Sequence, residues 1–521
     1  MRVTVDPPRV IGGRVTYSWH LSEPSDLQHR NRFMVRFHGV PLRRFHRAVL
    51  WEVLLTLQLP VWARMGERVV VTLPEPVPEV VVDWWRAYHD AQHVEFEGPL
   101  TAERTYDPHP GRRRARAPAD VAVSFGGGKD STLALSALLD TREPQRVLLL
   151  HILQHFSAHP LVAARAAWRS RRLVVGPVAR RTGVRTQLVT TNFIPTLTAR
   201  GRAARPHVNL YTAATLPALL HHGARAVTVS RTAMSYRCHE AKDGSLRWAN
   251  PSGRPERLRA LGAYYRSVLG VELEPEGTHY AVGEFASFGS LLQLYPDALD
   301  GMVMCMRTSG RGRWCAQCSK CLEFALFGLA LGHVAPDLAY DRLFHSDLVT
   351  ALVTSAVSRQ GQRSWHGNAP FVREIGTPSH FAAFCHAVHE VDLGLARQVM
   401  DPESLARLET LRQAWGRRPY PLVATIDEEA LKVAGPLGQE VGRRAAEALG
   451  FSSGLSPLSE PLPVGQQRVT FRHGARMSIP LLEGWRAQWA QASASDDVTA
   501  NVSDGGEASV GPAQVGKGGG S

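Results

Sequence analysis

The first 118 residues show the short, mixed hydrophobic periodicities of an α+β unit. Stretches in which apolar and polar positions alternate predict strands, and a longer apolar stretch with helical spacing predicts a helix. The expected strands are Phe33–Val40, Arg68–Leu73 and His93–Phe96, and the expected helix is Phe45–Leu59. Asp107–Pro118 is rich in Pro and Arg, so we interpret it as a linker that ends an N-terminal domain over residues 1–118.

The pattern changes at residue 119, where short apolar runs alternate with helical stretches. Short apolar runs predict strands, and their alternation with helical stretches predicts βαβ units and a parallel sheet. The expected strands are Asp120–Phe125, Arg146–Ile152, Arg185–Thr190 and Ala226–Ser230, with a helix over Ser131–Leu139. We therefore expect an α/β domain over residues 119–335.

Downstream of Gly332 the apolar spacing is mostly helical to about Leu449, apart from a loop at His366–Pro378. We expect a helical C-terminal region over residues 336–455 and an irregular segment over residues 456–521. From about residue 492 the composition is reduced to mainly Ala, Ser, Asp and Gly, which predicts a disordered tail. A chain of 521 residues is too long for one hydrophobic core, which also favours several domains.

The hydropathy of the chain gives no sign of a membrane or secretory protein. Met1–Gly12 contains no apolar segment of the kind found in a secretory signal. No apolar run approaches the roughly 20 residues of a membrane span. We therefore expect a cytoplasmic protein with no membrane partner.

The net charge of +13 at pH 7 comes almost entirely from arginine. A basic chain invites comparison with nucleic-acid-binding proteins. A GC-rich genome also favours arginine over lysine, however, and a substrate with phosphates needs cationic groups. Net charge is the only feature that supports a nucleic-acid partner. We therefore expect a small-molecule substrate instead. The sequence leaves the oligomeric state open.

A glycine run separates the first apolar strand of the α/β domain from its helix. The candidate ligand-binding residues there are Ser124, Gly126, Gly127, Gly128, Lys129, Asp130 and Ser131. Glycines let the backbone approach a polyanion, and the free N–H groups at a helix start attract it. A Walker A loop requires Ser or Thr after Gly-Lys, but here Asp130 follows Gly128-Lys129. The run therefore predicts a phosphate loop of another kind.

Gly-Gly-Lys-Asp-Ser over residues 127–131 resembles the PP-loop of the N-type ATP pyrophosphatases. This resemblance implies that the loop holds the pyrophosphate of ATP, that ATP is split into AMP and pyrophosphate, and that Asp130 helps to hold Mg²⁺. It also implies a parallel-sheet fold of the HUP type. The family has a serine where this chain has Gly126, so Ser124 is the hydroxyl available in its place.

Four of the six cysteines fall within 17 residues. The spacing is Cys305-x9-Cys315-x2-Cys318-x2-Cys321. In a large chain without a secretory signal, such clustering favours a metal over disulfides. Four thiolates suit a closed, structural Zn²⁺ site, and an iron–sulfur cluster is the alternative. The solitary Cys238 and Cys385 are typical of core thiols.

A PP-loop followed by this cysteine pattern resembles two families. They are the 7-cyano-7-deazaguanine synthases and the ATP-dependent UDP-N-acetylmuramoyl-L-alanyl-L-glutamate epimerases. Chain length favours the epimerases, since the synthases are little more than the PP-loop domain. The epimerase-like segments are the loop at residues 124–131, Arg313-Trp-Cys-Ala-Gln-Cys-Ser-Lys-Cys321, and His366-Gly-Asn-Ala-Pro-Phe371 leading to Ile375–Thr377. Three features depart from the family: Ala369 stands where the family has lysine, residues 230–233 match in part, and Tyr236–Val268 matches little.

The epimerase resemblance implies inversion of an amino-acid centre in peptidoglycan precursor synthesis. Adenylation of a carboxylate removes its charge and acidifies the neighbouring Cα–H enough for a side-chain base. Arg231 follows the fourth expected strand and is a candidate clamp for ATP phosphate or substrate carboxylate. His155, His159 and His239 also follow strands, but the sequence identifies no catalytic base.

Three other functions stay open at this stage. One is a carboxylate-amidating enzyme of the deazaguanine type, which would also form AMP. Another is a tRNA-modifying PP-loop enzyme, whose arginines at residues 112–116 and 165–185 would follow phosphates. The last is a nucleotide-sensing scaffold that binds ATP without turnover.

Overall fold

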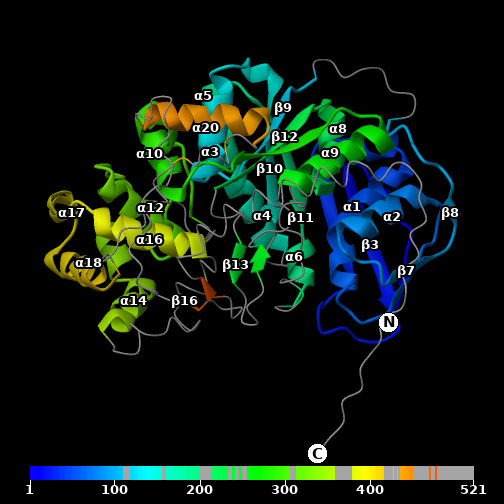
Figure 1. Cartoon of the computed structure of the whole chain (residues 1–521), viewed down its shortest axis with the longest axis horizontal. Coiled ribbons are helices and arrows are strands. Elements are labelled where there is room, and N and C mark those ends of the chain that lie inside the picture. The colour runs from blue at the N-terminus through cyan, green and yellow to red at the C-terminus, as the bar shows by residue number, and fades with distance from the viewer. Residues whose placement is uncertain are drawn as a thin grey trace, which may run out of the picture.

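The computed structural model describes residues 1–109, 118–154, 160–198, 201, 213–232, 238–240, 246–248, 255–305, 313–357, 378–415, 426, 431, 434–449, 469–470 and 476–477. Figure 1 shows the N-terminal strands at one end of the molecule and the helices of residues 340–415 at the other. Most of the expected linker, the loop at residues 366–377, and His155 and His159 lie outside the described residues. The tail expected from residue 492 also lies outside them.

The protein is an α/β protein built on an eleven-stranded mixed sheet. Five of its strands run parallel to one another in the order β15-β12-β9-β10-β11. These strands are β9 (Val121–Ser124), β10 (Val147–Gln154), β11 (Arg185–Thr191), β12 (Ala226–Thr232) and β15 (Glu274–His279). The chain runs outward from β9 to β10 and β11, and then returns to build β12 and β15 on its other side. The direction of winding therefore reverses between β9 and β12.

The four predicted parallel strands coincide with β9 to β12 to within about two residues, as expected for boundaries read from sequence. The fifth strand, β15, was not predicted. The first four residues of its sequence, Glu-Pro-Glu-Gly-Thr-His, are of types that are depleted in strands. It forms because β12 pairs with it in parallel over residues 226–229, so its partner supplies what its own composition does not.

The sheet continues from the parallel strands into the N-terminal residues. Strand β4 (Arg32–Phe37) pairs antiparallel with β11, and the order then runs β4-β3-β1-β5-β7. The other elements of this part are β1 (Arg2–Val5), β2 (Arg9–Ile11), β3 (Arg14–Leu21), β5 (Val69–Thr72), β6 (Val77–Pro78), β7 (Val94–Glu97), β8 (Leu100–Thr101), α1 (Arg47–Trp62) and α2 (Glu79–Tyr88). One continuous sheet therefore includes strands from both sides of residue 118, where we expected a domain boundary.

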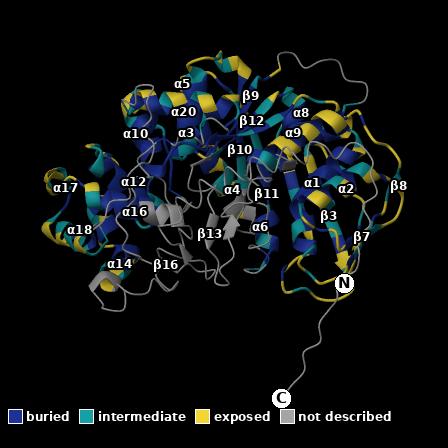
Figure 2. Ribbon diagram, viewed as in Figure 1, coloured by how far each residue is buried: buried dark blue, intermediate teal, exposed yellow. Residues whose placement is uncertain are grey.

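Helices cover both faces of the parallel strands, and most residues of these strands are buried (Figure 2). In β9, Val121 and Val123 belong to the hydrophobic core on one face, and Ala122 belongs to the core on the other. The first face packs on α3 (Lys129–Leu139), α5 (Gly176–Thr182), α10 (Glu284–Leu294) and α20 (Pro436–Ala448); the second packs on α1, α8 (Leu216–His222) and α9 (Pro255–Leu269). Burial on both faces explains the unbroken apolar run of this strand.

Further helices connect and extend these layers. Between β10 and β11 lie α4 (Pro160–Arg169), a π-helical segment η3 (Ser170–Val175) and α5. The helices described between residue 295 and α20 are α11 (Pro296–Asp300), α12 (Ser319–Ala330), α13 (Tyr340–Phe344), α14 (Asp347–Val357), α16 (Pro378–Glu390), α17 (Leu393–Val399) and α18 (Pro402–Trp415). In the part of the chain that the structure describes, none of the helices is both long enough and apolar enough to traverse a bilayer.

A buried carboxylate links the N-terminal residues to the α/β part. Glu52 of α1 is fully buried and accepts hydrogen bonds from the Tyr106 hydroxyl at 2.8 Å, the Tyr264 hydroxyl at 2.5 Å and the Trp85 indole. Tyr264 belongs to α9, so the contact crosses between the two parts. Burial raises the pKa of Glu52 to about 7, although the three donors oppose this shift.

The raised pKa of Glu52 predicts a pH-dependent stability. Between about pH 4.5 and pH 7 the folded protein keeps a proton that the unfolded chain releases, so the free energy of unfolding falls as the pH rises. The loss amounts to roughly 3 kcal/mol across that interval. Urea unfolding at several pH values measures it. E52Q should flatten this dependence, and an unchanged pH slope in E52Q would contradict the assignment.

Candidate functional site

The glycine loop lies at the carboxyl end of β9, where β12 is the neighbouring strand. This is the point at which the winding of the sheet reverses. In open α/β sheets the crevice outside the carboxyl ends of the strands at such a point is the usual place for a ligand. The fold therefore places the predicted loop at the position where a bound ligand is most expected.

The backbone of the loop is held by contacts within it. Gly128 caps the N-terminus of α3, and its carbonyl accepts from the Ser131 hydroxyl at 3.1 Å and the Thr132 hydroxyl at 2.9 Å. The Gly126 amide donates to Ser131 Oγ at 3.3 Å. The hydroxyl of Ser131, expected as a ligand donor, thus braces the loop in this structure.

The three glycines serve two different purposes. Gly127 has φ +81°, and a Cβ there would lie 2.7 Å from Val174 Cγ1. Its need for glycine is therefore conformational and steric. A Cβ on Gly126 or Gly128 would instead meet no atom of the described residues within 4 Å. The open side of the loop lies at these two residues, where an anion can approach the backbone closely.

Lys129 points into the protein, where carboxylates surround its ammonium group. The side chain is 2% exposed and pairs with Glu284, with Asp130 at 2.8 Å and with Glu323 at 3.9 Å. Burial alone would lower the pKa of Lys129, but the charges of Asp130, Glu284 and Glu323 raise it above its ordinary value. Lys129 is therefore a permanent cation whose charge is balanced inside the protein. Glu284 and Glu323 carry no motif signal in the sequence, and sequence reasoning missed them.

Buried polar side chains lie on strands next to the loop. Ser124, at the end of β9, is 8% exposed, and its Oγ has no hydrogen-bond partner among the described residues. His151 of β10 contacts the Phe125 carbonyl through Nδ1 at 2.7 Å, while its Nε2 has no such partner in the described part of the chain. Buried polar atoms generally take part in hydrogen bonds, so an atom without a partner in the chain is available to a water or a ligand. The predicted residue Ser124 fits that description.

His279, the last residue of β15, is a second histidine that sequence reasoning missed. It is fully buried, and burial lowers its pKa to about 4, with Asp130, Lys129 and Glu284 among the charges that act on it. Its Nδ1 lies 2.9 Å from the Thr278 hydroxyl, and its Nε2 has no hydrogen-bond partner within the described residues. It was missed because β15 itself was not predicted. The backbone of Arg231 lies in β12, but its side chain, like that of His239, is outside the description.

The predicted four-cysteine cluster is assembled in the structure. The sulfurs of Cys305, Cys315, Cys318 and Cys321 all lie within 4.8 Å of one another. Neighbouring pairs are separated by 3.5, 3.8 and 4.0 Å. Zn–S bonds of about 2.3 Å at tetrahedral angles place sulfurs about 3.8 Å apart. The cluster could therefore hold a metal such as zinc without rearrangement.

Contacts within the chain position the cysteines. Ala316 adopts φ +51°, which turns the chain between Cys315 and Cys318. Cys318 caps α12, and the Cys321 amide donates to its carbonyl at 3.0 Å. Trp314, which directly precedes Cys315, donates its indole N–H to Asp337 at 3.0 Å. Cys385 is a buried thiol whose pKa is raised by burial, as expected of a core residue; the side chain of Cys238 is outside the description.

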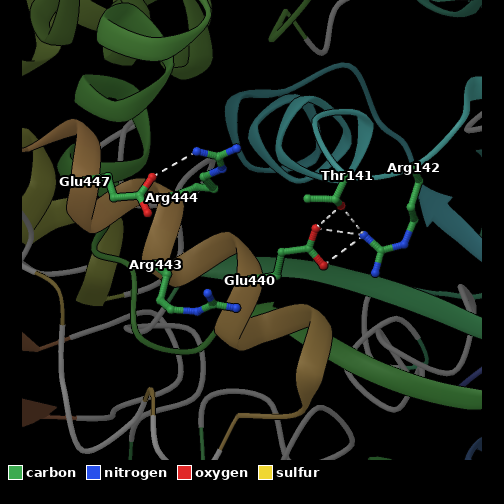
Figure 3. A pocket seen from close by; sticks show the side chains of 6 residues that line it. All are labelled: Thr141, Arg142, Glu440, Arg443, Arg444 and Glu447. Carbon is green, nitrogen blue, oxygen red and sulfur yellow. Dashed lines mark hydrogen bonds and ion pairs between the residues drawn. The ribbon is translucent and has the colours of Figure 1, made fainter.

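A separate cavity of about 470 Å³ lies at the other end of α3 (Figure 3). It is lined by Thr141, Arg142, Glu440, Arg443, Arg444 and Glu447. Arg142 Nη1 donates to both oxygens of Glu440 at 2.7 and 2.8 Å, and Arg444 pairs with Glu447 at 3.0 Å. Because these carboxylates already neutralise two arginines, we assign no binding role to this cavity.

Comparisons with known proteins found no matching family model, no similar curated protein and no similar solved structure. Fold and site by themselves define the class: an α/β protein with a large mixed, mostly parallel sheet, a glycine loop at its switch point and a four-cysteine cluster.

The two kinds of glycine predict different effects of alanine. G127A should destabilise the protein by about 1–3 kcal/mol, since it combines a left-handed backbone with a clash against Val174. G126A should change the free energy of unfolding by no more than about 0.5 kcal/mol, because its Cβ enters open space. Chemical unfolding of the two variants measures this difference, and equal losses would contradict the loop geometry.

The sulfur geometry predicts one zinc ion per chain in protein purified without chelator. Elemental analysis checks the stoichiometry. A chelator strong enough to remove zinc should lower the midpoint of thermal unfolding, because a structural metal contributes directly to the free energy of folding. Iron together with inorganic sulfide would instead identify the site as an iron–sulfur centre.

Proposed function

We propose that the chain is a PP-loop enzyme that binds ATP and forms AMP and pyrophosphate. The observation that carries this proposal is the Gly126–Ser131 loop at the switch point of the parallel sheet, with its open side at Gly126 and Gly128. A polyphosphate on that side would meet the backbone amides at the start of α3, an arrangement that favours anions. The family resemblance of the loop supplies the identity of the anion.

The side chains around the loop have roles that suit this chemistry. Asp130 is partly exposed, with 24% of its side chain accessible, and it offers the hard oxygen that Mg²⁺ prefers. Mg²⁺ held there would neutralise phosphate charge. Ser124 offers a hydroxyl beside the loop that has no hydrogen-bond partner among the described residues. The ammonium group of Lys129 is already paired with carboxylates of the protein, so its role is to hold the start of α3 in place.

The distribution of charge favours a second, strongly anionic substrate. Residues 144–239 contain 14 arginines and no Asp, Glu or Lys. The rest of the chain is close to neutral, with 46 basic and 47 acidic side chains out of totals of 60 and 47. This acid-free segment includes β10, β11 and β12, whose carboxyl ends share an edge with the loop. A nucleotide-linked substrate carrying phosphates and carboxylates suits such a field.

We assign the reaction as ATP-dependent epimerisation of the terminal L-glutamate of UDP-N-acetylmuramoyl-L-alanyl-L-glutamate or a related peptide residue. The glycine in place of serine at Gly126 and the Trp-Cys-x-x-Cys-x-Lys-Cys run at residues 314–321 support this choice. Transfer of AMP to the substrate carboxylate makes the Cα–H acidic enough to be removed and returned from the opposite face. Burial keeps the imidazoles of His151 and His279 neutral at pH 7, which makes them the histidines to test as proton carriers.

A tRNA-modifying enzyme is the second candidate, and one surface observation favours it. Trp168 is 53% exposed, and the guanidinium of Arg172 lies 5.1 Å from its ring. Both residues belong to the acid-free segment. An exposed aromatic beside arginines is a common platform for unpaired bases.

The proposed reaction predicts products that can be counted. Enzyme, ATP, Mg²⁺ and UDP-N-acetylmuramoyl-L-alanyl-L-glutamate in deuterated water should give AMP and pyrophosphate in equal amounts, and D-glutamate with deuterium at Cα. G126A should keep its fold and lose at least about tenfold in ATP affinity, because its Cβ fills the space beside the amides. The K129M/E284Q variant tests whether the ion pair between these two residues positions the loop.

Other outcomes separate the alternatives. AMP formation that requires ammonia and leaves the configuration unchanged would indicate an amidating enzyme. Salt-dependent tRNA binding would favour the second candidate. ATP binding without pyrophosphate release with any of these substrates would indicate a scaffold. An unchanged ATP affinity in G126A would refute the loop as the nucleotide site.

A further inference from the structure

The cysteine cluster and the glycine loop are joined by the backbone. The Val303 amide donates to the Gly127 carbonyl at 2.8 Å. Val303 lies two residues before Cys305, so this hydrogen bond connects the segment that supplies one sulfur to the centre of the glycine loop. A Cβ on Gly127 would also lie 3.4 Å from the Val303 carbonyl oxygen, which shows how closely the two segments pack.

A second connection runs through buried charges. Cys318 is the N-cap of helix α12, which carries Cys321 in its first turn and Glu323 just beyond. The Glu323 carboxylate pairs with Lys320 at 2.5 Å and with Lys129 at 3.9 Å. Lys129 is the first residue of α3, directly after the loop. A short chain of covalent bonds and ion pairs therefore leads from two of the sulfurs to the loop.

The packing between α10 and α12 makes this connection stiff. Rings of the two helices meet edge to face, with centroids 5.2 Å apart for Phe285–Phe327 and also for Phe288–Phe324. Trp314, next to Cys315, lies 4.3 Å from Phe324. Close-packed interiors transmit small displacements. A shift of α12 at its cysteine end would therefore move Glu323 and Glu284 relative to Lys129.

We propose that the four-cysteine cluster positions the glycine loop, so that metal held by the cysteines and nucleotide held by the loop stabilise each other. Lys129 and Glu323 are the positioning residues that carry this coupling, together with the Val303–Gly127 hydrogen bond. The nucleotide half rests on the proposed function. The link between metal and loop does not, because it follows from contacts within the chain.

Thermodynamic linkage makes the coupling reciprocal. If bound nucleotide tightens metal binding by some factor, bound metal must tighten nucleotide binding by the same factor. A metal that merely stapled a distant part of the fold would show no such factor, because nucleotide would then bind equally well to both forms.

The first experiment measures metal release and needs no nucleotide. Zinc leaving the folded protein is followed by the absorbance of a chromogenic chelator. E323Q, and the charge-neutral double variant K129M/E284Q, should release zinc at least about tenfold faster than the unmodified chain. E440Q is the matched control: it breaks an ion pair at the far end of α3, and its rate should stay within about twofold. E323D should restore slow release.

The second experiment repeats the measurement with α,β-methylene-ATP and Mg²⁺. The analogue should slow zinc release from the unmodified chain and from E440Q, and should have little effect on K129M/E284Q. Near-ultraviolet circular dichroism identifies any variant that has not folded. If E323Q has not folded, E323D is compared with the unmodified chain in its place.

The outcomes distinguish the two ideas. Unmodified rates of zinc release in both E323Q and K129M/E284Q would overturn the coupling. Faster release in these variants, with no effect of the analogue on the unmodified chain, would keep the link between metal and loop and would count against the proposed nucleotide site.

Discussion

The candidate site depends on the ion pairs between the buried ammonium group of Lys129 and the carboxylates around it. A cation with 2% exposure is tolerated only because carboxylates from its own helix, from α10 and from α12 surround it. Removing one member of such a group leaves another charge buried without a partner, which typically costs about 3–5 kcal/mol. Helices α3, α10 and α12 are thereby linked to one another at the point where the glycine loop ends.

The same constraint explains the arrangement of the neighbouring elements. Glu284 is the first residue of α10, and Glu323 lies in the first two turns of α12, so both carboxylates come from helix starts directed toward the loop. Helix α12 in turn is capped by Cys318, so its starting position and the cysteine geometry are set together. The four-cysteine cluster, the ion pairs of Lys129 and the loop form one contiguous structure and cannot be treated as three independent motifs.

The sequence could predict the parts of this structure that local patterns encode. Strand β9 is apolar because both of its faces are covered, the glycines announce the loop, and the cysteine spacing announces the cluster. Features that depend on pairing across the chain could not be predicted. Strand β15 has an unfavourable composition and forms only beside β12, the β4–β11 pair joins segments about 150 residues apart, and Glu284 becomes a partner of Lys129 only once α10 is packed. His279 was lost with the strand that carries it.

The internal balance of Lys129 has a consequence for how a polyanion would be attracted. With its ammonium group compensated by carboxylates, the loop offers mainly backbone amides, which orient phosphates well but exert little force at a distance. Longer-range attraction must come from other charges, and the acid-free segment at residues 144–239 is the part of the sequence with a large unbalanced excess. The excess consists entirely of arginine, whose guanidinium stays protonated and can bind phosphate or carboxylate through two parallel hydrogen bonds. Under the proposed function, attraction and alignment of the polyanion would thus fall to different residues, so weakening one by substitution should leave the other intact.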